Sequence, residues 1–151
     1  MEFNYNDGGR SKYFKASNVR DCAIRAISIA TKKDYKEVYD SLKKLNNGVS
    51  CRNGTPKKVD KKYLTKEGWK WVACIKPGTG MLVHLNENEL PSKGTIIIQV
   101  SKHLTCLVDG VLNDTYDCTR EGERGVYGIW YNPKEETKEI KEFIKQIEWR
   151  K

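Results

Sequence analysis

The chain has 151 residues and a formal net charge of +8, and 38% of its residues are hydrophobic while 32% are charged. This length suits one domain with a hydrophobic core, and the composition excludes a disordered chain. The sequence has no apolar run long enough to cross a membrane, and residues 1–7 lack the basic and apolar parts of a signal peptide. We therefore expect one domain over residues 1–151, located in the cytoplasm and without a membrane partner.

The first half of the chain predicts three helices after an irregular lead-in over residues 1–17. Apolar side chains cover most of the circumference of residues 21–31, so this first helix should be central and buried. Residues 34–37 match a capping box and begin a second helix, which Asn and Gly residues end near position 48. A third helix begins at Thr55-Pro56 and is closed by Gly68.

The second half of the chain changes to the spacing of strands. The predicted strands and their connections are residues 69–75 (strand), 77–80 (turn), 81–90 (short strand or helical turn), 95–100 (strand), 103–117 (hairpin), 120–125 (glycine-rich loop) and 126–131 (strand). Residues 134–149 place apolar side chains at helical spacing and predict a C-terminal amphipathic helix. This order predicts an α+β domain, with a helical N-terminal half packed on an antiparallel sheet.

The predicted hairpin places a histidine beside a carboxylate. Residues 109–110 (Asp-Gly) are a strong two-residue turn signal, and this turn pairs His103 with Tyr116. His103 and Asp114 are then diagonal neighbours on one face, within side-chain reach. Asp117 falls on the other face, so Asp114 is the preferred orienting carboxylate and Asp117 the alternative. A one-residue bulge would reverse that ranking.

Cys22 stands at the start of the first predicted helix. A cysteine nucleophile needs a field that stabilises its thiolate, an imidazole that exchanges protons with it, and an acceptor that orients the imidazole. A helix N-terminus supplies the field, and the hairpin can supply the other two groups. The pattern therefore indicates a triad of Cys22, His103 and Asp114.

Plainer interpretations of the same residues stay open. Cys22 could be a small buried helix residue, because free cysteines are often buried. His103 could be a histidine satisfied at a strand edge, and His84 is the alternative imidazole. Asp114 could be a strand-end residue that bonds backbone amides.

The five cysteines do not indicate a disulfide framework, because their number is odd and no CxxC pair occurs. His103, Cys106 and Cys118 could surround a zinc ion, but no fourth ligand has suitable spacing. We therefore expect Cys106 and Cys118 to be structural, and we expect no metal or organic cofactor. Asp21 and Arg25 are expected to be helix-start and buried ion-pair residues.

Two segments carry a resemblance to a known family, namely Asp21-Cys22-Ala23-Ile24-Arg25-Ala26 and the hairpin over residues 103–117. With the order of elements, they resemble the papain-like cysteine peptidase superfamily in a minimal form. The chain is also similar to small bacteriophage-type proteins that share the layout of bacteriocin-processing peptidase domains. This resemblance implies a central nucleophile helix, a protein or peptide substrate, and the cytoplasm of a bacterial host if a phage encodes the chain.

One position departs from the papain-like pattern. Such enzymes usually place a Gln shortly before the nucleophile as an oxyanion donor, and the corresponding residue here is Ala16. Asn18 is the nearest amide side chain and could donate instead, together with the backbone N–H of Cys22. If Asn18 does not reach the oxyanion, turnover should be poor.

The favoured function is a cysteine peptidase or thiol hydrolase that cleaves an amide, isopeptide or thioester bond. The alternative is a catalytically inactive papain-like phage protein that binds and inhibits a host or defence component through its basic surface. Nucleic acid is a weaker hypothesis, because the basic residues are dispersed and the tryptophans of the strands are expected to line the core or a groove. The sequence does not define an oligomeric state.

Overall fold

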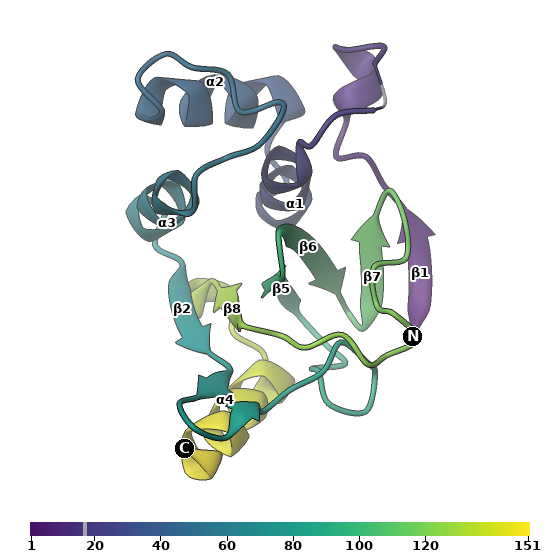
Figure 1. Ribbon diagram of the computed structural model, residues 1–151, viewed down its shortest axis with the longest axis vertical. Coiled ribbons are helices and arrows are strands. Elements are labelled where there is room, and N and C mark those ends of the chain that lie inside the picture. Colours follow the sequence, from purple (N-terminus) through teal and green to yellow (C-terminus); the bar gives the residue numbers. More distant parts are fainter. Residues whose placement is uncertain (17) are drawn as a thin grey trace.

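A six-stranded sheet in the order β1-β7-β6-β5-β8-β2 runs through the molecule. The computed structural model describes residues 1–16 and 18–151 of the chain (Figure 1). The strands of this sheet are β1 (Glu2–Tyr5), β2 (Lys70–Ala73), β5 (Thr95–Val100), β6 (His103–Val108), β7 (Val111–Asp114) and β8 (Gly128–Tyr131). A separate two-stranded ribbon consists of β3 (Ile75–Lys76) and β4 (Gly80–Met81).

Three helices form the core on one face of the sheet. They are α1 (Cys22–Thr31), α2 (Tyr35–Leu45) and α3 (Lys57–Lys66), and α1 packs chiefly on β6. Seven of the ten residues of α1 are buried, so the predicted central helix is confirmed. Helix α1 ends where Lys32 takes a left-handed conformation, and α3 is followed by Gly68 at φ +89°.

The opposite face of the sheet is covered by α4 (Lys138–Arg150) and the loops between β4 and β5 and between β7 and β8. Helix α4 buries Ile140, Phe143 and Ile147 against strand side chains such as Ile96 and Ile98. The predicted α+β class, with N-terminal helices on a mostly antiparallel sheet and a C-terminal helix, is therefore confirmed. In the part of the chain that the structure describes, no helix is long and apolar enough to cross a bilayer.

The hairpin of β6 and β7 has the predicted register. Val108 pairs with Val111, and Leu107 pairs with Leu112. Asp109 and Gly110 have φ angles of +49° and +79°, as a two-residue turn between right-twisted strands requires. This turn determines which side chains of the two strands share a face.

The N-terminal segment differs from the expected irregular lead-in. Residues 2–5 form β1, which pairs in parallel with β7, and residues 10–12 form a short 3₁₀ helix. The side chain of Asn113 accepts hydrogen bonds from Asn4 (2.8 Å) and Asn6 (3.2 Å). Residues 2–5 alternate polar and aromatic side chains, which is a strand signal, so the expectation of an irregular lead-in was wrong for this segment.

Several element ends also differ from the prediction. Helix α4 begins four residues later than expected, because the hydroxyl of Thr137 caps it by accepting from the N–H of Ile140 at 3.1 Å. The expected capping box at the start of α2 is not formed. Its cap residue, Asp34, accepts a hydrogen bond from the Tyr13 hydroxyl (2.6 Å) and none from the backbone of α2. Strand β2 is shorter than residues 69–75, and β8 begins two residues after position 126.

Candidate functional site

A histidine and an aspartate meet at one end of the β6–β7 hairpin. His103 is the first residue of β6 and Asp114 is the last residue of β7. Since the strands are antiparallel neighbours, these two positions come together, and His103 Nε2 lies 2.7 Å from Asp114 Oδ2. Both side chains are buried, with 7% and 3% of their surface exposed. The predicted proximity of the two groups is therefore present in the structure.

Asp114 is held by donors on both carboxylate oxygens. Oδ1 accepts from the backbone N–H of Thr115 at 2.7 Å and faces Arg25 Nη2 at 3.3 Å. Burial raises the pKa of Asp114, but the hydrogen bonds that it accepts and the charge on His103 outweigh burial and leave the pKa below its ordinary value. Asp114 is therefore ionised near neutral pH and fixes the orientation of the imidazole.

The His103 imidazole is stabilised in its charged form. Burial lowers its pKa, but hydrogen bonding with Asp114, Cys118 and Cys22 raises the pKa to about 12. Because Nε2 is taken by Asp114, Nδ1 is the ring nitrogen that remains for a thiol. An imidazolium beside a thiol favours the thiolate, which is the nucleophilic form of cysteine.

Two cysteines, in different surroundings, lie near His103. Cys22 is partly exposed and is the first residue of α1, where the helix dipole favours negative charge. Cys118 is buried, and its Sγ lies 3.7 Å from Asp114 Oδ2. We predicted a purely structural role for Cys118, and that prediction did not anticipate its position beside His103 and Asp114. No spacing in the sequence indicated it, because Cys118 is brought back to the hairpin by the loop that follows β7.

A pocket of about 570 Å³ lies beside His103. The Tyr116 ring packs against the imidazole of His103, with the two ring centroids 5.2 Å apart. Cationic side chains predominate around the pocket, which is lined by Ser101, Lys102, His103, Tyr116, Asp117, Cys118, Arg120 and Arg124.

The alternative site residues Asp117 and His84 bond to other groups than the His103–Asp114 pair. Asp117 is exposed and accepts hydrogen bonds from the N–H and hydroxyl of Thr119 (2.9 and 2.7 Å). His84 lies outside the cluster, with its Nδ1 3.3 Å from a carboxylate oxygen of Glu89. Asn18 is exposed on the segment that precedes α1, and its role as an oxyanion donor stays a prediction.

Buried ion pairs hold the start of α1 in place. Asp21 is fully buried and accepts from Arg25, from Arg10 at 3.0 Å and from the hydroxyl of Tyr35 at 2.6 Å. Arg25 also faces Asp114, so one guanidinium connects the helix start to the hairpin. The predicted buried ion pair between Asp21 and Arg25 is confirmed. It positions Cys22, the residue between Asp21 and the body of α1.

His103, Asp114 and Cys118 could also hold a metal ion. Their ligand atoms all lie within 4.8 Å of one another, and imidazole, carboxylate and thiolate are all zinc ligands. The zinc set considered from the sequence included Cys106, but this side chain lies in the apolar core beneath α1. Arg25 already places a positive charge on Asp114, which opposes a second cation there.

Comparisons of the chain with models of protein families, with curated proteins and with solved structures found no match. The resemblance to papain-like peptidases is thus not supported by a relative. The structure supports an α+β fold with a mixed six-stranded sheet and a buried His-Asp-Cys group.

Proposed function

We propose that the protein is a papain-like thiol hydrolase in which Cys22 is the nucleophile, His103 the general base and acid, and Asp114 the residue that orients the imidazole. The observation that carries this proposal is the 2.7 Å bond between His103 and Asp114, with a partly exposed thiol at a helix N-terminus beside the same imidazole. Cys22 is assigned the nucleophile's role, because it is partly exposed at a helix N-terminus, whereas Cys118 borders the pocket beside His103 but has only 2% of its surface exposed.

In the proposed reaction, His103 holds the proton that Cys22 loses. The Cys22 thiolate attacks the carbonyl carbon of an amide, isopeptide or thioester, so a C–S bond forms and the carbonyl electron pair moves to oxygen. The tetrahedral intermediate collapses as the bond to the leaving group breaks, and His103 gives its proton to that group. Neutral His103 then removes a proton from water, which hydrolyses the acyl-enzyme and releases the acid.

Two donors are assigned to the oxyanion. As the first residue of α1, Cys22 has a backbone N–H with no acceptor inside the helix. Asn18 is the second donor, on the segment that leads into α1. The hydrogen bond from each donor strengthens as negative charge develops on the carbonyl oxygen. This stabilisation of the oxyanion is the main electrostatic contribution in acyl transfer.

The proposal is tested by the rate at which iodoacetamide labels Cys22 at pH 6, read for each cysteine separately by peptide mass spectrometry. We expect wild-type Cys22 to react at least about tenfold faster than Cys22 in His103→Ala, which is the change that one pKa unit of thiolate stabilisation gives. His84→Ala is the matched control and should leave the rate unchanged. Equal rates in wild type and His103→Ala would contradict the proposed pair.

The same labelling separates the proposed enzyme from two other functions. Preferential labelling of Cys118 would exclude Cys22 as the activated thiol. Protection of the cysteines by one equivalent of Zn²⁺, reversed by a chelator, would favour a metal site at His103, Asp114 and Cys118. If Cys22→Ala keeps the biological activity, the inactive binding protein is the better interpretation.

A further inference from the structure

A second pocket, of about 490 Å³, lies between α3 and the strands at the β2 edge of the sheet. In Figure 1, α3 stands directly above β2 and β8 on the left of the view. This volume is in the range of pockets that hold small molecules. Aromatic and cationic side chains predominate in the lining, which consists of Lys57, Asp60, Lys61, Trp71, Ala73, Ile75, Gln99, Tyr127 and Trp130.

Asp60 lines this pocket, and one of its carboxyl oxygens has no partner in the part of the chain that the structure describes. Only 8% of its surface is exposed, and its Oδ1 has no hydrogen-bond partner within residues 1–16 and 18–151. The side chain lies in the first turn of α3, but it does not cap that helix. Leaving a buried carboxyl oxygen unpaired is unfavourable by about 1–3 kcal/mol or more. A buried acceptor that no protein group satisfies is therefore available to a ligand.

Two tryptophans line the pocket beside Asp60, and Trp71 is the exposed one. Trp71 and Trp130 are cross-strand partners on β2 and β8, with ring centroids 5.3 Å apart. Trp71 keeps 42% of its surface exposed. Its ring lies against Gly128, where a Cβ would overlap it. The ring is thus supported from behind by the sheet and keeps an open surface to which a planar ligand can bind.

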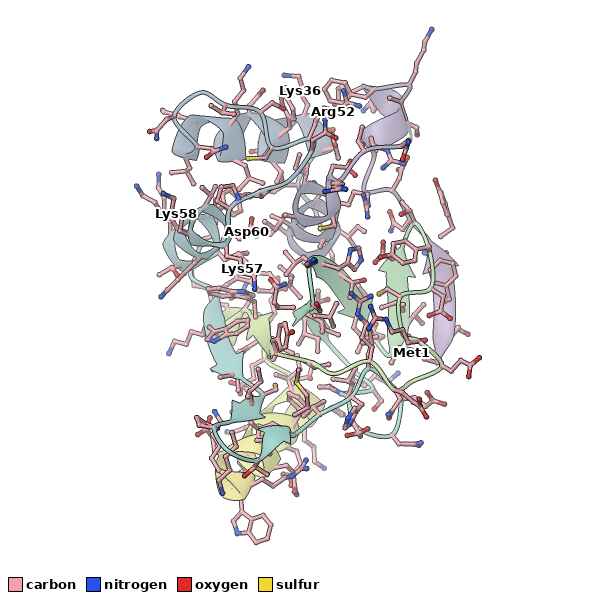
Figure 2. All side chains as sticks on the ribbon, viewed as in Figure 1. Met1, Lys36, Arg52, Lys57, Lys58 and Asp60 are labelled. Carbon is pink, nitrogen blue, oxygen red and sulfur yellow. The ribbon has the colours of Figure 1, made fainter. Side chains whose placement is uncertain are left out.

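Lysines give the pocket a positive rim. Lys57 and Lys61 come from the same helix as Asp60, and Lys57 Nζ lies 5.6 Å from the centre of the Tyr127 ring. Figure 2 shows Lys57 and Asp60 on the side of α3 toward the sheet, whereas Lys58 points away from it. Two cations against one carboxyl group disfavour a positively charged ligand. The lining instead matches an anion that carries an aromatic ring with N–H donors.

We propose that this pocket binds a guanine nucleotide, with the base stacked on the exposed face of Trp71, its N–H donors on Asp60, and its phosphate on Lys57 and Lys61. Guanine presents an imino and an amino N–H side by side, which together match one carboxylate. Stacking on an aromatic face is open to every base, so the preference for guanine comes from Asp60. This inference does not depend on the thiol chemistry of Cys22.

The ionisation of Asp60 adds a testable signature. Burial raises the pKa of Asp60 to about 8, although the charge of Lys57 lowers it in part. The free carboxyl group is therefore largely protonated at pH 6.5, and a ligand that donates two N–H bonds binds its ionised form. Affinity for the guanine nucleotide then increases as the pH rises from 6.5 to 8.5, and the increase is lost in Asp60→Asn.

Isothermal titration calorimetry of the full chain with GMP, AMP, UMP and inorganic phosphate tests the proposal. We expect saturable binding of GMP that is tighter than binding of the other three ligands. The dissociation constant for GMP should rise at least about tenfold in Asp60→Asn and about fivefold or more in Trp71→Leu. Lys58→Ala, on the same helix but outside the pocket, should bind GMP as wild type does, and so should Cys22→Ala. Circular dichroism verifies that each variant is folded.

Three results would overturn the proposal. The first is no heat of binding with millimolar GMP. The second is equal affinity for all three nucleotides and phosphate with no effect of Asp60→Asn, which would indicate attraction of phosphate to the lysines alone. The third is Asp60-dependent binding of n-butylammonium that is tighter than binding of GMP, which would identify a site for amines. Because none of these measurements involves thiol reactivity, their failure is distinct from failure of the proposed hydrolase.

Discussion

At the scale of single residues, Asp114 organises the candidate site. One of its oxygens orients His103, and the other faces Arg25, which in turn reaches Asp21 at the start of α1. The carboxylate thus links the imidazole of the hairpin to the helix that carries Cys22. Asp117 is only three residues further along the chain, but it bonds the local backbone and side chain of Thr119.

This difference predicts unequal effects of two matched substitutions. Asp114→Asn removes the charge that stabilises protonated His103, so the rate of Cys22 alkylation at pH 6 should fall by about tenfold or more. It also leaves Arg25 without its full counter-charge, so we expect the free energy of unfolding to fall by about 3–5 kcal/mol. Asp117→Asn should change the alkylation rate by less than about twofold. Equal effects of the two substitutions on the rate would contradict the assignment of Asp114.

At the scale of elements, two junctions join the layers of the fold. The first is the parallel pairing of β1 with β7, which attaches the N-terminus to the strand that carries Asp114. The second lies where β5 begins beside α4. There the Thr137 hydroxyl caps α4 and donates to the backbone oxygen of Lys93 at 2.9 Å. Gly94 allows this approach, because it has a φ of +92° and a Cβ there would lie 2.6 Å from Ile140 Cδ1.

From the contacts of Thr137 we expect that its substitution lowers the stability of the fold and leaves the reactivity of Cys22 unchanged. Thr137→Ala removes the N-cap of α4 and the bond to Lys93, so the free energy of unfolding should fall by about 1–2 kcal/mol in urea denaturation. Thr137→Ser keeps the hydroxyl and should recover most of that loss. Cys22 alkylation should be unchanged in both variants, because α4 lies on the face of the sheet opposite α1. A loss of thiol reactivity in Thr137→Ala would mean that the two faces are coupled.

At the scale of the whole molecule, buried ionisable groups determine how stability depends on pH. The pKa of Asp114 is lowered on folding, so its contribution is present above pH 3.8, the ordinary pKa of an aspartate, and is lost as the pH falls through the folded value. The pKa of His103 is raised, so its contribution is complete below pH 6.5 and decreases as the pH rises toward about 12. The pKa of Asp60 is raised to about 8, so folding is opposed increasingly as the pH rises from about 4 to 8.

These signs predict maximal stability near about pH 4 to 5, because Asp60 opposes folding increasingly as the pH rises further. Urea denaturation of wild type should give a lower free energy of unfolding at pH 8 than at pH 5. Asp60→Asn cannot ionise, so it should gain stability relative to wild type by a few kcal/mol over the same interval. Lys58→Ala, a change of one exposed charge on the same helix, should show the wild-type pH dependence. A stability difference between wild type and Asp60→Asn that does not vary with pH would show that Asp60 ionises normally.

Much of the architecture was determined by patterns within single segments. The apolar circumference of residues 21–31 and the turn at residues 109–110 predicted a central helix and the register of the hairpin. That register by itself places His103 beside Asp114. Local periodicity and turn geometry were sufficient, because both residues lie within one hairpin of short sequence separation.

Features that depend on contacts between distant segments were decided only by the tertiary structure. Strand β1 pairs with the edge of β7, and the short alternation of its four exposed residues does not specify that partner. Cys118 joins the candidate site through the course of a loop, and Asp60 becomes a buried, unpartnered acceptor only when α3 packs over β2 and β8. Edge pairing, loop course and desolvation arise from segments far apart in the chain, so no local pattern in the sequence encodes them.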